Sequence, residues 1–353
     1  MAPLTRRKLL GSASALGLGA AALHATIPHS HGATAAAAEP ADMAGMQMSG
    51  DAPHDAAGHG GHAAFRGGEV DHAANGFSPH DVLRDFDWGK TSTLPDGRTL
   101  REWTIAAGEQ EIELAPGVRF AAWSYNGRIP GPTLRAKEGD RLRIRFYNGG
   151  THPHTMHFHG IHRGTADGVL GLGAGEVAPG QSTVYEFDAL PFGLHLYHCH
   201  VRPLAEHIAK GLYGAFIIDP KDERERADEL VMVMNGFDTN FDRANELYAA
   251  NTIGFAYNEH PIQIKRDELV RLYLVNVLEY DLLNSFHLHG NFFHYFPTGT
   301  SRTPSELTDT VMLCQGQRGI LEMRFPYAGK YMFHAHQSEF TELGWMGFFE
   351  VSD

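Results

Sequence analysis

His198-Cys199-His200 sets one thiol between two imidazoles. In a β-strand, residues i and i+2 point to one face, about 6.5 Å apart, while the residue between them points to the other face. We therefore expect His198 and His200 to share one face of a strand and Cys199 to occupy the opposite face. A single short segment would then offer a different set of ligands on each side.

Three further His-x-His pairs make this segment part of a pattern. They are His157-Phe158-His159, His287-Leu288-His289 and His334-Ala335-His336. One such pair is commonly an ordinary strand face, but two pairs in the same order in each half of the chain form an internal repeat. Neutral imidazoles suit Cu, Fe, Ni or Zn, and a single zinc needs only four ligands, so eight imidazoles favour a polynuclear site.

The segments around the pairs predict β-structure. Short runs of β-forming residues are separated by Gly, Pro and Asn, as in sandwich folds. The runs are 119–123, 141–147, 182–187 and 215–218, then 230–234, 269–277, 319–325 and 347–351. A charged stretch at 219–229 divides the two sets. The sequence therefore predicts two sandwich domains in tandem, joined near residue 225.

Cys199 narrows the choice of metal. By spacing, His154 and His207 are placed to join its sulfur on the face opposite His198. One thiolate with two imidazoles is the trigonal set of a blue copper electron-transfer site. Leu212 falls at the axial position, and because leucine cannot coordinate, its presence should favour Cu(I) and raise the reduction potential. The alternative for Cys199 is a buried structural thiol, the role we expect for Cys314.

These residues, together with Asn126-Gly127-Arg128-Ile129-Pro130-Gly131-Pro132 and Glu138-Gly139-Asp140, resemble the multicopper oxidase family. The resemblance runs from about residue 98 to the end. More narrowly, the chain is similar to the two-domain, small laccase-like members that keep the type 1 copper in the first domain. It implies an all-β fold of two tandem cupredoxin-like Greek-key β-sandwiches, at 91–224 and 225–353.

The resemblance also implies roles for the ligands. The type 1 copper would be held by His154, Cys199 and His207, and the type 2 copper by His157 and His287. The type 3 pair would be held by His159, His198, His200, His289, His334 and His336. With one type 1, one type 2 and two type 3 coppers, each chain would carry about four. The family's assembly is a homotrimer in which each trinuclear cluster lies between domain one of one subunit and domain two of the next.

The second domain departs from the type 1 pattern. Asn284 stands where domain one has His154, Ala335 replaces the cysteine, and Leu343 or Gly344 falls near the second His position. This domain is therefore expected to hold no type 1 copper. Met346 lies at a place that resembles an axial ligand, but without a thiolate or imidazoles it is expected to pack in the core.

Asp167 is the candidate catalytic acid for proton supply. It lies eight residues beyond His159 and matches an acidic residue near the trinuclear cluster in the family. Its alternative is a turn-capping Asp before Gly168. His162 and His294, which also follow the pairs closely, suit either hydrogen bonding to metal ligands or the outer rim of the site.

Composition supports a metal-binding, non-nucleic-acid role. The 353 residues carry a formal charge of -13, with 23 His and 2 Cys. Such acidity argues against a phosphate backbone as partner and favours a small-molecule or metal-ion reductant, with dioxygen as the acceptor that the resemblance implies. The acidity alone does not identify the donor, so phenols, aromatic amines, metal ions and small redox proteins all remain open.

The N-terminal region predicts export. Arg6-Arg7 followed by a short run rich in Gly, Ala and Ser resembles a twin-arginine signal, assigned to 1–38. A transmembrane anchor is the alternative, but the run is short, so we expect no stable membrane insertion. Residues 39–90 are expected to be a Met- and His-rich disordered linker, either a tether or a collector of copper. The mature protein would be extracellular, cell-wall associated or periplasmic.

Three rival functions remain at the level of sequence. A copper-containing nitrite reductase shares the two-domain trimer, but its mononuclear type 2 site would leave several of these imidazoles unused. A non-enzymatic copper-binding or resistance protein is suggested by the Met and His stretch. A manganese or zinc cupin-like protein is a third alternative, against which His198-Cys199-His200 argues.

Overall fold

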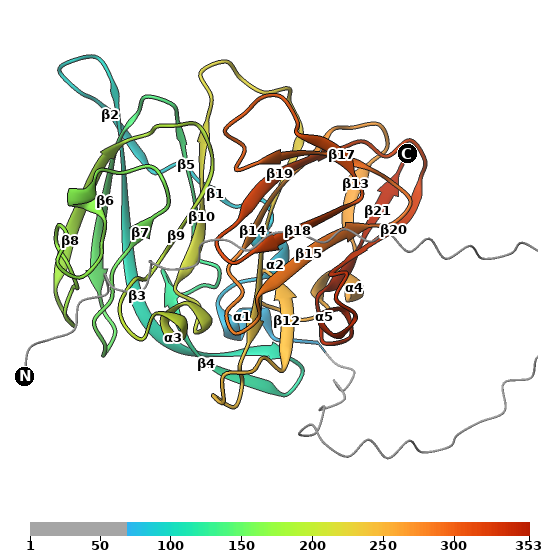
Figure 1. Ribbon diagram of the computed structural model, residues 1–353, viewed down its shortest axis with the longest axis horizontal. Helices are drawn as coiled ribbons and strands as arrows, with labels where there is room; N and C mark the ends of the chain where they lie inside the picture. Colours follow the sequence, from blue (N-terminus) through green and yellow to red (C-terminus); the bar gives the residue numbers. More distant parts are fainter. Residues whose placement is uncertain (1–68) are drawn as a thin grey trace, which may run out of the picture. The chain divides into compact units, whose positions relative to one another are not determined.

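The computed structural model describes residues 69–353, which form four β-sheets and a few short helices (Figure 1). The expected signal segment at 1–38 and the linker up to residue 68 lie outside the described residues. Of the residues that are described, none belong to a helix long and apolar enough to cross a membrane.

Two sheets form the first sandwich. One has the order β1-β5-β10-β9-β7, and the other has the order β2-β3-β6-β8 with β4 paired to β3. The first contains β1 (Phe86–Asp87), β5 (Thr133–Lys137), β10 (Tyr213–Asp219), β9 (Gly193–His198) and β7 (His157–Phe158). The second contains β2 (Lys90–Thr93), β3 (Thr99–Ala115), β4 (Val118–Tyr125), β6 (Arg141–Asn148) and β8 (Ser182–Asp188).

The other two sheets form the second sandwich. Their orders are β12-β11-β14-β19-β16-β17 and β13-β21-β20-β15-β18. The larger contains β12 (Leu247–Ala250), β11 (Asp228–Phe237), β14 (Val270–Asn276), β19 (Arg318–Met323), β16 (Phe293–Pro297) and β17 (Glu306–Thr308). The smaller contains β13 (Ile262–Lys265), β21 (Met346–Ser352), β20 (Gly329–His334), β15 (Leu283–Leu288) and β18 (Thr310–Cys314).

Short helices connect the strands. They are α1 (His72–Asn75), α2 (Pro79–Val82), the 3-10 turn η1 (Gly164–Ala166), α3 (Leu204–Ala209), α4 (Ala256–Glu259) and α5 (Ser338–Glu342). Two of them, α3 and α5, occupy the same place in the two repeats, just after the second His-x-His pair. The all-β architecture of two tandem sandwiches is thus confirmed, and all eight strands expected from the sequence are present.

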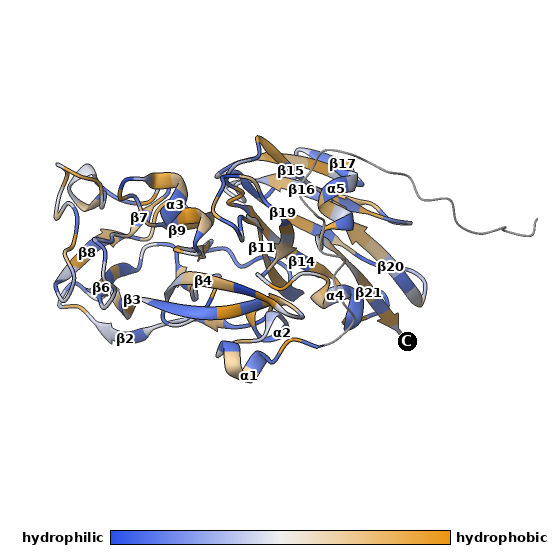
Figure 2. Cartoon of the chain, turned by 90° about the horizontal axis from the view of Figure 1, so that it is seen from below, coloured by the Kyte–Doolittle hydropathy of each residue, from blue (hydrophilic) through white to orange (hydrophobic). Residues whose placement is uncertain are grey.

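Three apolar clusters form the core of the protein. One fills the first sandwich around Trp103, Phe158 and Tyr197, and another fills the second around Phe286, Phe333 and Trp345. The third joins them, because it combines residues of β9 and β10 with residues of β11, β14 and β19. Hydrophobic residues are concentrated on β11 and β14 in Figure 2. Burial of these faces is the main stabilising contribution to the fold.

The prediction that the disordered linker extends to residue 90 is wrong for residues 69–90. Residues 69–90 contain α1, α2 and β1 rather than disordered chain. Phe77, Val82 and Leu83 are buried in the cores, and the carbonyl of Leu83 accepts a hydrogen bond from the backbone N–H of Val231 at 2.9 Å. A few large apolar side chains order this segment, because each buries its surface against the strands of the two cores.

Candidate metal centres

The first candidate centre is a buried triangle of one sulfur and two nitrogens. Cys199 directly follows β9, His154 pairs with Val177 in an isolated bridge, and His207 lies on α3. Cys199 Sγ is 3.2 Å from His207 Nδ1 and 3.9 Å from His154 Nδ1, and the two nitrogens are 3.3 Å apart. The centre of such a triangle is about 2.0 Å from all three atoms, which is a normal metal–nitrogen distance.

Backbone contacts fix the sulfur and its surroundings. The Thr155 N–H points at Cys199 Sγ at 3.4 Å, and the Cys199 N–H donates to the Leu212 carbonyl at 2.9 Å. Leu212 is fully buried beside Cys199. The Trp123 ring makes edge contacts with both imidazoles, with centroid distances of 5.1 Å to His154 and 4.7 Å to His207. The triangle is therefore enclosed by apolar side chains.

Burial sets the protonation of these groups. It lowers the pKa of His154 and of His207 to about 4, so that both rings are neutral ligands at neutral pH. Burial also raises the pKa of the Cys199 thiol to about 11. A bound cation would have to displace that proton, as is usual for thiolate sites, so metal uptake should release acid. The donor set fits a copper ion of the blue type.

Four imidazoles gather on the other side of this segment. The His157 ring lies 5.2 Å from those of His198 and His200, and the His159 ring lies 4.9 Å from that of His198 (centroid distances). The Nε2 atoms of His159 and His198 face each other at 2.8 Å. The expected division of the two faces is therefore present, although His159, Cys199 and His200 lie just beyond the ends of β7 and β9.

Partners of the Nδ1 atoms orient these rings. His157 Nδ1 lies 3.0 Å from both the carbonyl and the Oδ1 of Asp167, and His198 Nδ1 lies 2.8 Å from the Cys199 carbonyl. With Nδ1 engaged, Nε2 of each ring is the atom available to a metal. Burial lowers the pKa of His159 to about 3 and that of His198 to about 4. His162 Nε2 also contacts Asp167, at 3.2 Å.

The second sandwich repeats this arrangement. The His287 ring centroid is 5.3 Å from those of His334 and His336, and the Nε2 atoms of His289 and His334 are 2.9 Å apart. His287 Nδ1 contacts the Asp309 carbonyl at 3.1 Å and Thr310 Oγ1 at 2.8 Å. The two half-sites thus have the same internal geometry. They differ in burial, because His289 and His336 are exposed.

The second sandwich has no counterpart of the thiol triangle. Ala335 occupies the place of Cys199, and Asn284 is buried with no hydrogen-bond partner for its Nδ2 atom. The Ala335 N–H donates to the Trp345 carbonyl at 3.2 Å, as the Cys199 N–H does to Leu212. Trp345 therefore corresponds to Leu212. Met346 is one position further on and is not at the axial place.

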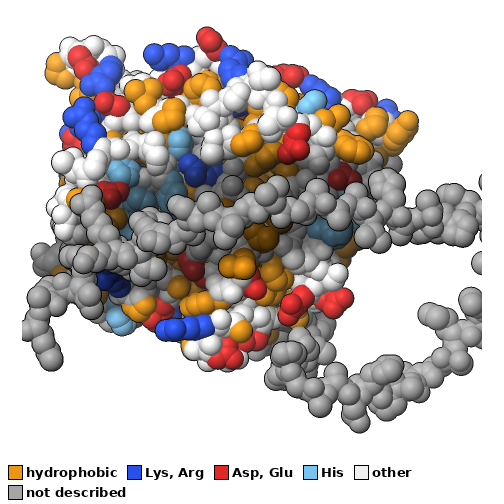
Figure 3. All heavy atoms as spheres, in the orientation of Figure 1, with side chains coloured by type: hydrophobic (Ala, Val, Ile, Leu, Met, Phe, Trp, Pro, Cys, Tyr) orange, Lys and Arg blue, Asp and Glu red, His pale blue; other side chains and the backbone are white. Residues whose placement is uncertain are grey.

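Within one chain the two imidazole half-sites are separate. Every group of three or more potential ligands found in residues 69–353 with ligand atoms mutually within 4.8 Å draws on a single sandwich. Figure 3 shows histidine side chains over the β7–β9 region and again over the β15–β18 region. Each half offers four imidazoles, so neither alone supplies eight.

Several functional neighbours were missed by sequence reasoning. Asp309, Thr310 and Thr341 contact the second half-site, the last through its Oγ1 at 3.2 Å from His334 Nδ1. The pairing of β15 with β18 sets Thr310 opposite His287 and so places Asp309 and Thr310 beside that ring. No sequence motif predicts this register. His294 is exposed on β16.

The expectation that Cys314 is buried is wrong. Cys314 is exposed at the end of β18. Side chains alternate along this strand, so that Val311 and Leu313 face the core while Met312 and Cys314 face outward. The position of Cys314 in the alternation of β18, and not its residue type, determines that it is exposed.

Comparison with known proteins gives the family. Two models described as multicopper oxidase match residues 106–223 and 226–353. A solved multicopper oxidase is 65% identical and covers 80% of this chain and 100% of its own, with a TM-score of 0.79. The blue copper oxidase of Nitrosomonas europaea is 26% identical and covers 71% of this chain and 86% of its own, with a TM-score of 0.65.

One relative is named for nitrite reduction and not for oxidase activity. The copper-containing nitrite reductase of Neisseria meningitidis is 29% identical over 248 residues, which is 65% of this chain. The chain spans only 63% of the length of that relative. The two family models together cover most of the chain, and the 65% identical structure is matched over its whole length. This chain, with its tandem cupredoxin-like sandwiches, belongs to the multicopper oxidase family, a family of copper-binding oxidoreductases.

Proposed function

We propose that the protein is a laccase-like oxidase. It couples the one-electron oxidation of a reduced substrate, a phenol, an aromatic amine or a metal ion, to the four-electron reduction of dioxygen to water. The observation that carries this proposal is the division of ligands around residues 198–200. A thiol with two imidazoles lies on one side, and four imidazoles lie on the other.

Each group of ligands has its own role. His154, Cys199 and His207 hold a type 1 copper, and His157 and His287 hold the type 2 copper. The type 3 pair is held by His159, His198, His200, His289, His334 and His336. Copper held at these positions would supply one-electron redox chemistry, and the copper held by the imidazole half-sites would be where dioxygen is reduced. The chain itself provides the connection between the two kinds of site, because the main chain of Cys199 is bonded directly to His198 and His200.

The second half-site comes from another subunit. His289 and His336 are exposed, which would leave a metal held by this half open to water on one side. Nearby apolar side chains are exposed as well, with Leu282 at 88% and Met312 at 65%. Exposed apolar surface of this kind marks an interface. A cyclic homotrimer would cover it by placing domain two of one subunit against domain one of the next.

The rival function is nitrite reduction, which the name of the Neisseria relative suggests. A mononuclear type 2 site needs three imidazoles, whereas the first half-site alone brings four imidazole rings together. We expect purified, copper-loaded protein to consume dioxygen with phenols or aromatic amines as donors and to contain about four coppers per chain. Nitrite consumption without oxygen uptake, at about two coppers per chain, would reverse the assignment.

Asp167 has two functions in this proposal. It holds the His157 ring through Nδ1, and it passes protons toward the site of oxygen reduction. We expect Asp167→Ala to lower the turnover number by roughly 10- to 100-fold, because the side-chain partner of a metal-bound imidazole is lost. Asp167→Asn keeps a side-chain oxygen for His157 but cannot carry a proton.

Comparing the two variants separates these functions. If Asp167 only orients His157, Asn should restore most of the turnover that Ala removes, with copper content unchanged. If it also carries protons, the Asn variant should keep its copper but turn over slowly. Wild-type turnover in both variants would exclude Asp167 from the site.

A further inference from the structure

His162 is a mostly buried histidine to which the proposed function gives no role. It lies between the end of β7 and the η1 turn. Its Nε2 is 3.2 Å from Asp167 Oδ1, and its Nδ1 is 2.9 Å from the Arg163 carbonyl. Its ring makes edge contacts with those of His157 and Phe187, with centroid distances of 5.5 and 6.2 Å. Both ring nitrogens are therefore engaged, and two neighbouring rings fix the plane of the imidazole.

The segment that carries Asp167 has little regular structure of its own. Between β7 and β8, where every residue is described, the only helix or strand is η1. The segment is also rich in glycine, with Gly164, Gly168, Gly171, Gly173 and Gly175. Glycine leaves the backbone many conformations, so a side chain on such a segment depends on its contacts for a fixed position. The Asp167 carboxylate therefore needs an outside partner to stay beside His157.

The second half-site meets the same need with its own sheet. His287 Nδ1 contacts the Asp309 carbonyl and Thr310 Oγ1, and the Thr310 hydroxyl donates to Asp309 Oδ1 at 3.0 Å. Thr310 belongs to β18, which is paired with β15 in a fixed register that sets Thr310 opposite His287. Asp167 lies in no strand. In the first half-site a side chain has to provide what strand pairing provides in the second.

We infer that His162 is a positioning residue: it holds the Asp167 carboxylate against His157 Nδ1 and so fixes the orientation of the His157 ring. Asp167 Oδ1 lies 3.0 Å from His157 Nδ1 and 3.2 Å from His162 Nε2. One carboxylate oxygen has two lone pairs and can accept from both rings. A partner at Nδ1 that fixes the tautomer and the orientation of a histidine strengthens its binding of metal through Nε2. This inference rests on the proposed function, which assigns His157 to the type 2 copper.

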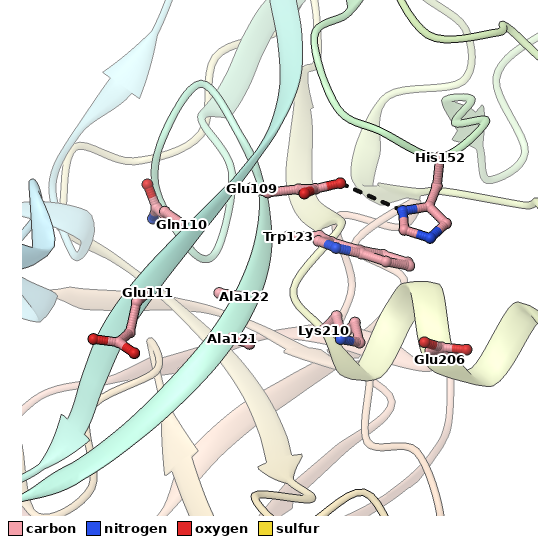
Figure 4. Close-up of a pocket in the computed structure, with 9 residues that line it drawn as sticks. All are labelled: Glu109, Gln110, Glu111, Ala121, Ala122, Trp123, His152, Glu206 and Lys210. Carbon is pink, nitrogen blue, oxygen red and sulfur yellow. Dashed lines mark hydrogen bonds and ion pairs between the residues drawn. The ribbon is translucent and has the colours of Figure 1, made fainter.

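A histidine beside a carboxylate is not sufficient for this role. His152 Nδ1 lies 3.4 Å from Glu109 Oε1, as Figure 4 shows, but these side chains are 55% and 35% exposed. Exposed pairs of this kind contribute little stability. The ring beside His152 is that of Trp123, at 4.9 Å, and not an imidazole of a half-site. The side chains of His162 and Asp167 are only 9% and 19% exposed, and both contact His157.

Two amide variants separate the contacts of His162. In His162→Gln the amide nitrogen comes near the place of Nε2 and can donate to Asp167, whereas the shorter side chain of His162→Asn reaches only the place of Nδ1. Each full-length protein is stripped of copper and refilled in competition with a chelator, and the type 2 copper is followed by electron paramagnetic resonance. His162→Asn should weaken this copper roughly three- to tenfold, less than the loss of a direct partner would, and alter its spectrum. His162→Gln should restore most of both. His152→Asn is the matched control and should change neither.

The same titration in an Asp167→Ala background shows whether His162 acts through Asp167. His162→Asn should then have no further effect, because the carboxylate that it positions is gone. Wild-type affinity and spectrum in His162→Asn would overturn the inference, as would equal losses in the two amide variants or a loss that persists in full beside Asp167→Ala. None of these results depends on turnover, so the oxidase assignment would stand. If the copper-loaded wild type consumed no dioxygen, the proposed function would be contradicted instead, and the copper titrations would still decide the role of His162.

Discussion

Replacing Cys199 by serine is expected to abolish both the blue colour and oxygen uptake. The sulfur lies 3.2 Å from His207 Nδ1 and 3.9 Å from His154 Nδ1, and a hydroxyl oxygen is a poor substitute because it is not a soft, anionic donor at neutral pH. The intense absorption of a blue site comes with its thiolate, so it should disappear. Oxygen uptake should fall about 100-fold or more, a larger effect than the loss of a ligand's hydrogen-bond partner.

The copper count gives an independent readout for this variant. It should fall by about one per chain, because the imidazole half-sites do not use the sulfur. Cys314→Ser is the matched control, since that thiol is exposed on β18 and belongs to none of the groups of potential ligands found in the described chain. It should retain colour, copper and activity. A Cys199→Ser protein that still oxidises donors at the wild-type rate would show that electrons reach the cluster by a route that avoids the triangle.

The sequence was sufficient to predict the ligands because strand geometry is local. Alternation of side chains alone separates Cys199 from His198 and His200, and the structure has this separation although the segment extends past the end of β9. The β-strands could be predicted equally well, since hydrophobic runs between Gly and Pro identify strands without knowledge of the fold. The internal repeat then extended both results to the second half.

What the sequence did not reveal depends on register and on distant packing. Thr310 meets His287 because β15 pairs with β18, and the same register turns Cys314 outward. Phe77 and Val82 become ordered because they find partners in cores built by strands much later in the chain. Trp123 beside the triangle is a similar case. A tryptophan on a strand has no spacing rule that points to His154 or His207.

Subunit complementation tests the origin of the second half-site and is expected to restore activity to a mixture of inactive proteins. His157→Ala damages only the half-site in the first sandwich, and His287→Ala damages only the equivalent half-site in the second. Each homotrimer should be inactive, since every cluster lacks one type 2 ligand. Co-expression with two different tags, followed by purification on both, isolates trimers that contain both variants.

Every such mixed trimer contains one interface at which an intact domain one meets an intact domain two, whichever variant is present twice. Its oxygen uptake should therefore reach about a third of the wild-type rate per trimer, because a cyclic trimer has three equivalent interfaces. A mixture of His157→Ala with His159→Ala is the control and should stay inactive, since both changes fall in the same half-site. If each cluster were instead completed within one chain, no combination of variants could rebuild it. We expect complementation because every group of potential ligands found in the described chain draws on a single sandwich, so a neighbouring copy has to bring the two imidazole groups together. Mixed trimers as inactive as their parents would rule out sharing of the half-sites between subunits.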